Sequence, residues 1–186
     1  MIIIIFIIAF EYFLMCINYV YNSRLNKLSG FIENQHKGTA SNYRIGLFAS
    51  KHNGCGWIAC RNVLHLLSQK RSISWIIFFL EFCFGPVLFG IFGINPLAIA
   101  LLLMCCNCNV SIKRPKYNVD KSASNVGILL CFARRMHAHY TAFERKGDEF
   151  IIHNPHIKTK SLDAYISERK LKFALLINVS PKVRIY

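Results

Sequence analysis

Apolar residues fill long runs of this chain, and the polar breaks between the runs divide it into the elements we expect. Residues 1–20 are almost wholly apolar, interrupted by Glu11 and Asn18, and such a run is about long enough to cross a bilayer. It has neither the basic start nor the small-residue cleavage site of a secretory signal, so we expect an uncleaved anchor. Arg24 and Lys27 follow the run, which favours the cytoplasmic side of the membrane for the rest of the chain. The alternatives are a hydrophobic first helix packed on the domain, which would then be cytoplasmic, or an extension with no role.

A polar stretch separates this run from the rest of the chain. It predicts a short helix over residues 19–32, followed by a linker, with the compact domain beginning near Asn42. A chain of 186 residues is long enough for one domain with a real core and too short for two large ones. We therefore expect residues 1–41 to form the apolar helix and linker, and residues 42–186 to form a single domain.

A cysteine stands where a loop becomes a helix. Gly54 and Gly56 flank Cys55, and apolar residues recur on one helical face from Trp57 to Leu67. Glycines allow a sharp turn and a close approach of substrate to the main chain. A thiol in the first turn of a helix lies near unpaired N–H groups and the positive end of the helix dipole, which favour the thiolate. Cys55 is therefore a candidate nucleophile, with a buried structural thiol as the alternative.

Two more apolar helices follow. The first covers residues 73–84, where Glu81 is the only charge; we place it at the rim of a pocket, or else buried beside a base. A Gly-Pro pair ends this helix, and an Asn-Pro pair begins a third helix over residues 97–104. The run 82–106 is long enough for a second membrane span, but the two prolines interrupt it and favour short helices in a buried core.

A β-hairpin is predicted downstream, because two runs of aromatic and β-branched residues are joined by a charged turn containing Gly147. His139 begins the first strand, and Asn154 ends the second, just before a proline. These ends are neighbours in an antiparallel pair, so Asn154 can accept a hydrogen bond from the His139 ring and fix its tautomer. Together with Cys55 they supply a nucleophile, a base and an orienting amide. His137 is the rival for the base, since it would share the face of His139.

The remaining segments complete an α+β pattern. Residues 110–112 alternate as a short strand, 125–132 can be strand or helix, 162–169 a short helix, and 171–179 a strand inside the sheet. We expect a helical part that begins at the candidate cysteine and packs on an antiparallel sheet, with the thiol in the cleft between them.

These residues resemble a known family. The block Asn-Gly-Cys-Gly-Trp-Ile-Ala, the block over residues 90–99 and the His-Tyr-x-x-Phe and Asn-Pro hairpin are similar to papain-like cysteine peptidases. The similarity is closest to the compact bacterial branch that cleaves the double-glycine leaders of bacteriocins, and it covers roughly residues 48–156. It implies a papain-like fold and a cysteine peptidase or amidase that cleaves a peptide or protein substrate. By this resemblance Cys55 is the nucleophile, His139 the base and Asn154 the orienter.

One position departs from the family pattern. The family usually has a Gln six residues before its cysteine, which helps to bind the oxyanion, and here that residue is Ala49. The Asn53 side chain and the Cys55 backbone N–H would replace it, and losing one donor can cost on the order of 10²-fold in rate. A weak or inactive peptide-binding relative is therefore an alternative, and a small basic membrane protein without an active site is another. The residues expected beside the substrate are Gly54, Gly56 and Trp57.

The net charge and the cysteine content limit the kinds of partner and cofactor that we expect. Lys and Arg number 23 against 9 acidic residues, a net charge of +14 spread along the chain, which attracts acidic peptides, anionic lipid or nucleic acid. No nucleic-acid-binding motif accompanies the charge, so an anionic membrane surface is the better second partner beside the peptide substrate. The eight cysteines lie mostly in apolar runs and suggest reduced thiols. The cluster over residues 105–108 lacks a second Cys pair, and no phosphate-binding loop is present, so we expect no metal and no cofactor. Nothing in the sequence indicates the oligomeric state.

Overall fold

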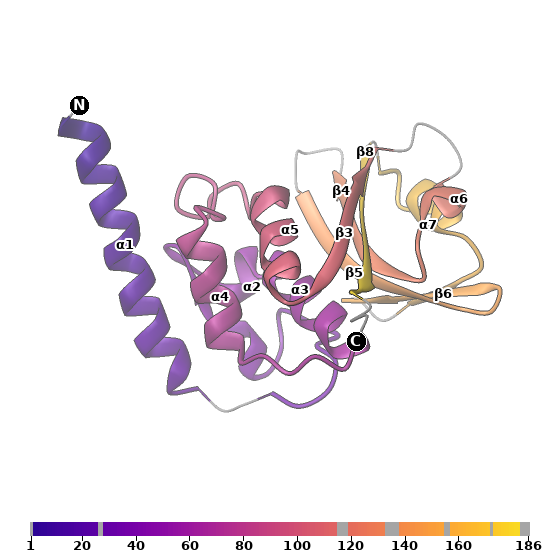
Figure 1. Ribbon diagram of the computed structural model, residues 1–186, viewed down its shortest axis with the longest axis horizontal. Coiled ribbons are helices and arrows are strands. Elements are labelled where there is room, and N and C mark those ends of the chain that lie inside the picture. The colour runs from indigo at the N-terminus through magenta and orange to yellow at the C-terminus, as the bar shows by residue number, and fades with distance from the viewer. Residues whose placement is uncertain are drawn as a thin grey trace.

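A six-stranded antiparallel sheet forms the centre of the protein, with strands in the order β3-β8-β4-β5-β6-β7 (Figure 1). The computed structural model describes residues 2–25, 28–114, 119–132, 138–154, 157–171 and 173–182. The strands of this sheet are β3 (Cys108–Lys113), β4 (Val126–Phe132), β5 (Ala138–Lys146), β6 (Glu149–His153), β7 (Ile157–Thr159) and β8 (Phe173–Pro181). A separate two-stranded sheet is made by β1 (Arg44–Ile45) and β2 (Phe48–Ala49).

Helices cover both faces of the large sheet. They are α1 (Ile2–Ser23), α2 (Ser50–Asn53), α3 (Cys55–Leu66), α4 (Ile73–Phe82), α5 (Pro96–Cys105), α6 (Val119–Ser122) and α7 (Leu162–Glu168), with a 3-10 helix at Thr39–Asn42. Figure 1 shows α3, α4 and α5 on one side of the sheet, α6 and α7 on the other, and α1 outermost beside α4. The predicted α+β architecture is therefore confirmed.

Alternation along the strands separates two hydrophobic cores. On β4, Ile128 and Leu130 belong to the core shared with α3, α4 and α5, whereas Leu129 and Cys131 belong to the core shared with α7. Successive side chains on a strand point to opposite faces, so β5 divides in the same way. The β5 residues on the α3 side are Ala138, Tyr140 and Ala142, and those on the α7 side are His139, Thr141 and Phe143. This parity decides where the candidate base lies.

Several predicted boundaries agree with the structure. Helix α3 begins at Cys55, and α5 begins at its proline with the Asn95 side chain accepting a hydrogen bond from the Leu97 N–H at 2.9 Å. The hairpin is formed by β5 and β6. Residues 125–132, left open between strand and helix, contain strand β4, and β8 lies inside the sheet between β3 and β4.

One predicted helix differs from the structure. The helix expected over residues 19–32 is not a separate element. Residues 19–23 are the end of α1, and the described residues 28–34 are irregular because Ile32 pairs through its backbone with the buried Asn62 side chain. The preference for two short helices over a second membrane span across residues 82–106 agrees with the structure, because turns separate α4 from α5 and each helix has 10 residues. Glu81 is buried at 5% exposure rather than at a pocket rim. The domain boundary near Asn42 stays a prediction.

Helix α1 is long and apolar enough to cross a membrane by length and composition alone. The qualifying segment is residues 3–23, and an 18-residue window within it has a mean hydropathy of 2.2 and is 11% buried. It packs along α4 (Figure 1), with Met15, Asn18 and Asn22 buried on the inner side.

Candidate active site

Close packing explains the glycines beside Cys55. A Cβ on Gly54 would lie 2.5 Å from the Ser50 carbonyl oxygen, and one on Gly56 would lie 2.7 Å from the Ile94 side chain. Both glycines are buried, and Trp57 is fully buried, with its indole N–H donating to the Ser50 hydroxyl at 2.7 Å. The three residues expected beside the substrate therefore build the core in this conformation. The two glycines correctly predicted that a helix begins at Cys55, but close packing against Ser50 and Ile94 explains why glycine stands at these positions.

The Cys55 thiol is buried between α3 and β5. Only 7% of the residue is exposed, and burial raises the pKa of the thiol. Backbone groups of Tyr140, Gly56 and Cys55 itself lower the pKa, as expected for a thiol at the start of a helix, but burial is the larger effect. The expectation of a resting thiolate is therefore wrong for this conformation.

His139 and Asn154 are neighbours, as the hairpin register predicts. The His139 Nε2 lies 3.0 Å from the Asn154 backbone carbonyl oxygen. The Asn154 side chain instead pairs with Gln35: its Oδ1 accepts from the Gln35 backbone N–H and its Nδ2 donates to Gln35 Oε1, both at 3.3 Å. Asn154 has a φ of 65° at the end of β6, where the chain turns. The orienting group in this structure is thus a carbonyl and not the amide that we expected.

The candidate base and nucleophile lie on opposite faces of β5. Tyr140 shares the α3-side core with Cys55, whereas the adjacent His139 lines a cavity on the α7 side. No hydrogen bond joins the Cys55 thiol to the His139 ring, both of which belong to the described part of the chain. The cavity has a volume of 380 Å³ and is lined by Cys131, His139, Thr141, Tyr165, Arg169 and Leu171. The Cys55 thiol therefore contacts the backbone of β5 at Tyr140, while the His139 ring lies on the other face of the strand.

Cys131 is the thiol that shares a face with His139. The two residues are direct partners in the β4–β5 ladder, and Cβ atoms of such pairs are about 4.5–5.5 Å apart. Burial raises the pKa of Cys131 to about 12, so this thiol is not activated. The pKa of His139 is lowered, chiefly by burial and further by Arg169 and His36, while the Asn154 carbonyl raises it. The imidazole is consequently held in its neutral form, which is the form a general base requires.

The candidate oxyanion donor is engaged elsewhere. The Asn53 side-chain Nδ2 donates to the backbone carbonyls of Gly90 at 3.2 Å and Ile45 at 3.4 Å. Its Oδ1 is buried without a hydrogen-bond partner among the described residues. Asn53 is 8% exposed, so its amide must leave these carbonyls before it can bind an oxyanion. His137, the rival base, lies outside the described residues.

A short irregular segment contacts Asn154, the candidate orienting residue. Residues 31–35, here called the strap, are fastened by Asn62, whose side chain accepts from the Ile32 N–H and donates to the Ile32 carbonyl, both at 2.9 Å. Phe31 stacks on His153 with ring centroids 4.2 Å apart. The strap ends on Asn154 through Gln35, which is 7% exposed. The sequence did not predict these contacts, because neither Gln35 nor Asn62 belongs to a recognisable motif and their partners are distant in the chain.

The overall fold is similar to that of a solved peptidase domain. The peptidase domain of Streptococcus ComA, a bi-functional ABC transporter involved in a quorum sensing pathway, superposes with a TM-score of 0.52 at 13% identity, covering 74% of this chain and 97% of that domain. This chain therefore shares the fold of that peptidase domain. A double glycine motif protease from an AMS/PCAT transporter, solved in complex with its leader peptide, has a TM-score of 0.49 at 13% identity, covering 69% of this chain and 84% of that one. Neither known sequence families nor curated protein sequences gave a match.

Proposed function

We propose that this chain is a cysteine peptidase or amidase that acts on a peptide or protein substrate, with Cys55 as nucleophile and His139 as base. The observation that carries the proposal is the position of the thiol. Cys55 is the first residue of α3, and its thiol lies against the backbone of Tyr140, the residue that follows His139. The likeness of the fold to a solved peptidase domain supports the same chemistry.

Catalysis requires the closed site to rearrange. The His139 ring must leave the Asn154 carbonyl and reach the α3 side of β5, where it can take the proton of the Cys55 thiol. The thiolate then attacks the substrate carbonyl, the leaving amine takes the proton from His139, and water or another nucleophile resolves the acyl-enzyme. Release of the strap frees the Asn154 side chain to orient the imidazole. The Cys55 backbone N–H and the Asn53 amide are the candidate oxyanion donors.

Peptide binding without turnover is the second candidate, and three observations favour it. Cys55 is 7% exposed with a raised pKa, the Asn53 amide is engaged by Gly90, and Ala49 replaces the usual oxyanion glutamine. In this case the chain would bind a peptide at the same junction of α3 and β5, and Cys55→Ala would leave the affinity unchanged.

A matched pair of thiol variants separates these functions. Cys55 and Cys131 are both buried thiols that belong to the cores on opposite faces of the sheet: Cys131 pairs with His139 in the β4–β5 ladder, and Cys55 lies against the backbone of Tyr140. We expect cleavage of a peptide library, and labelling by a peptide-based acylating probe, to be lost in Cys55→Ala and kept in Cys131→Ala. Labelling that persists in Cys55→Ala would sink the assignment. Peptide binding without cleavage at any pH would instead select the second candidate.

The proposal places the domain at a membrane. By length and composition α1 suits an anchor, and Arg24 after its C-terminal end fits a domain on the cytoplasmic side. The net charge of +14 fits an anionic lipid surface. Flotation of the full chain with phospholipid vesicles tests this placement, and a chain that stays in the aqueous fraction would contradict it.

A further inference from the structure

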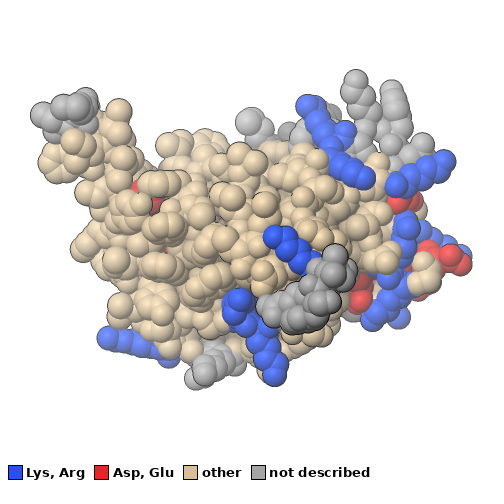
Figure 2. Space-filling view, in the orientation of Figure 1, with Lys and Arg blue, Asp and Glu red and all other residues tan. Residues whose placement is uncertain are grey.

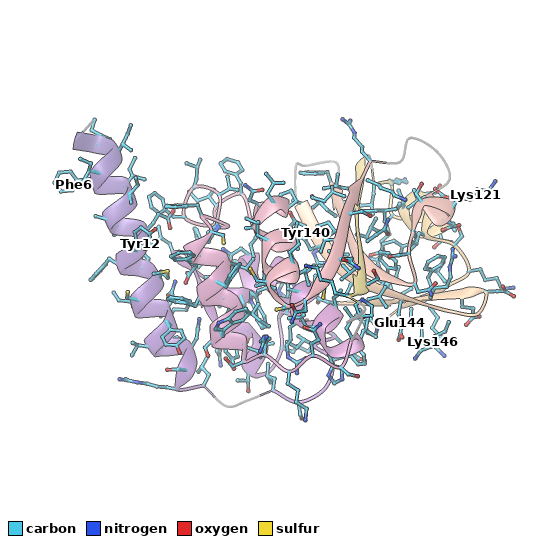
Figure 3. All side chains as sticks on the ribbon, viewed as in Figure 1. Phe6, Tyr12, Lys121, Tyr140, Glu144 and Lys146 are labelled. Atoms are coloured by element: carbon cyan, nitrogen blue, oxygen red, sulfur yellow. The ribbon has the colours of Figure 1, made fainter. Side chains whose placement is uncertain are left out.

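Helix α1 buries its two asparagines, Asn18 and Asn22, on the inner side and exposes most of its apolar residues, while Glu11 is partly buried. Asn18 is 2% exposed and donates to Glu81 Oε1 at 2.6 Å and to the Gly46 carbonyl at 2.9 Å, and Asn22 pairs with the backbone of Arg44. On its outer side, Phe6 is 71% exposed and points away from the body of the protein (Figure 3). A helix on a water-facing surface has the opposite distribution. Buried polar side chains bonded within the protein, under an apolar exterior, are typical of helices surrounded by lipid.

A second apolar region continues this exterior. The last residue of α4, the α4–α5 connection and the outer side of α5 expose nine large apolar side chains, from 38% at Val87 to 61% at Ile91 and Leu97. They are Phe82, Phe84, Val87, Leu88, Ile91, Phe92, Leu97, Leu101 and Met104. Aromatic contacts join this region to α1. Ring centroids are 5.4 Å apart between Phe10 and Phe89 and 5.9 Å apart between Tyr12 and Phe84.

We call these two regions together the apolar face. It holds nearly all of the exposed large apolar side chains in the described part of the chain. Leu47 lies at its edge, since its N–H donates to the Phe89 carbonyl at 3.0 Å, and the two exposed outside it are Phe31 and Ile112. Exposed apolar patches of such extent mark interaction sites.

The segments that form the apolar face contain no Lys or Arg. All 23 Lys and Arg residues lie outside residues 1–23 and 73–112, and the two acidic residues within these segments are Glu11 and the buried Glu81. Figure 2 shows blue side chains gathered along the lower and right-hand sides, while the side with α1 and the α4–α5 connection is almost entirely tan. A protein partner is usually met by an apolar centre within a polar rim. A wide surface without cations, bordered by basic residues, fits hydrocarbon bordered by anionic headgroups.

We propose that the whole apolar face lies in the hydrocarbon layer of a lipid bilayer, so that the α4–α5 connection and α5 enter the lipid beside α1. This inference rests on the proposed membrane placement and not on the proposed chemistry. It makes the peptidase domain itself part of the membrane contact, in place of a domain tethered by α1 alone. The junction of α3 and β5 is then held close to the membrane, because Asn53 and Tyr140 both bond to the α4–α5 connection through the carbonyls of Gly90 and Ile94.

Tryptophan fluorescence in vesicles tests the inference with the full chain. Ile91→Trp places a reporter on the α4–α5 connection, and Ile112→Trp on β3 is the matched control, since both positions are exposed in the structure. The proteins are reconstituted in phosphatidylcholine and phosphatidylglycerol vesicles, with brominated lipid as the quencher in the hydrocarbon and iodide as the quencher in water. Emission is compared with that of the parent chain, which has two tryptophans. Leu97→Trp on α5 serves as a second reporter if the first variant does not fold.

The inference predicts that brominated lipid quenches Ile91→Trp and Leu97→Trp while iodide does not, and that Ile112→Trp behaves in the opposite way. Quenching of Ile91→Trp by iodide in a chain that floats with vesicles would overturn it, because α1 alone would then hold the protein. Protection of Ile91→Trp from both quenchers would also overturn it, since a protein partner or a second copy would cover the face. A chain that does not bind vesicles contradicts the membrane placement and leaves the test of Cys55 unaffected.

Discussion

Glu81 gives the sharpest prediction about stability. Its carboxylate joins α4 to two other parts of the chain, because Oε1 accepts from Asn18 Nδ2 at 2.6 Å and from the Gly46 N–H at 2.8 Å. Its Oε2 is buried without a hydrogen-bond partner among the described residues. Burial raises the pKa of Glu81 from 4.5 to about 8, although these two donors act in the opposite direction.

A raised pKa in a carboxyl group makes the folded state less stable as the pH rises. The folded protein keeps the proton of Glu81 up to about pH 8, whereas the unfolded chain loses it near pH 4.5. The stability linked to this proton is complete below pH 4.5 and is lost progressively up to pH 8. At about 1.4 kcal/mol for each pKa unit, the loss is on the order of 5 kcal/mol.

Glu81→Gln should remove this dependence. Glutamine keeps the oxygen that accepts from Asn18 and Gly46 and cannot ionise. The free energy of unfolding, measured by urea titration in a nonionic detergent, should therefore match that of the parent chain near pH 4 and exceed it by several kcal/mol near pH 8. Asp148→Asn, in the exposed turn between β5 and β6, is the control and should leave the pH dependence unchanged. A parent chain whose stability does not fall relative to Glu81→Gln between pH 5 and 8 would refute the reasoning.

Three further predictions concern the site. Asn62→Ala removes both hydrogen bonds to Ile32 and should lower the free energy of unfolding by about 2–4 kcal/mol, with the strap becoming sensitive to limited proteolysis; an unchanged cleavage pattern would count against its fastening role. Tyr140→Phe leaves the Ile94 carbonyl without its 2.7 Å hydrogen bond and should cost about 1–2 kcal/mol, measured by the same titration. In the absence of substrate, alkylation of Cys55 by iodoacetamide should keep rising about tenfold per pH unit through pH 9, because burial raises the pKa of its thiol; a plateau at acidic pH would instead indicate a preformed thiolate–imidazolium pair.

Local patterns were sufficient for much of the fold. The turn into α3 at Cys55, the cap of α5 at Asn95 and the β5–β6 hairpin each depend on a few adjacent residues, and all three agree with the structure. The prediction of a helix over residues 19–32 was wrong because Asn62, which is distant in the sequence, bonds to the backbone of Ile32 and holds it in an irregular conformation.

The arrangement of the site depends on which residues of β5 face α3 and which face α7. His139 lies on the α7 side because the larger Tyr140 fills the α3-side core and donates from its hydroxyl to Ile94. The sequence of β5 shows which residues alternate between its two faces, but it does not show which face packs on which helix. The neighbouring positions of His139 and Asn154 were therefore predicted correctly, whereas the face of the sheet on which His139 lies was not. The pairing of Gln35 with Asn154 joins residues 119 positions apart, and no local signal predicts such a contact.

The central claim is that Cys55 is the nucleophile, and the site of acylation tests it most directly. The chain would be incubated with an activated thioester of a short peptide, and the acyl group would be located among the eight cysteines by peptide mass spectrometry. We predict acylation at Cys55 that is lost in His139→Ala and kept in Cys131→Ala. An acyl group found on Cys131, or none on Cys55 at any pH, would contradict the account.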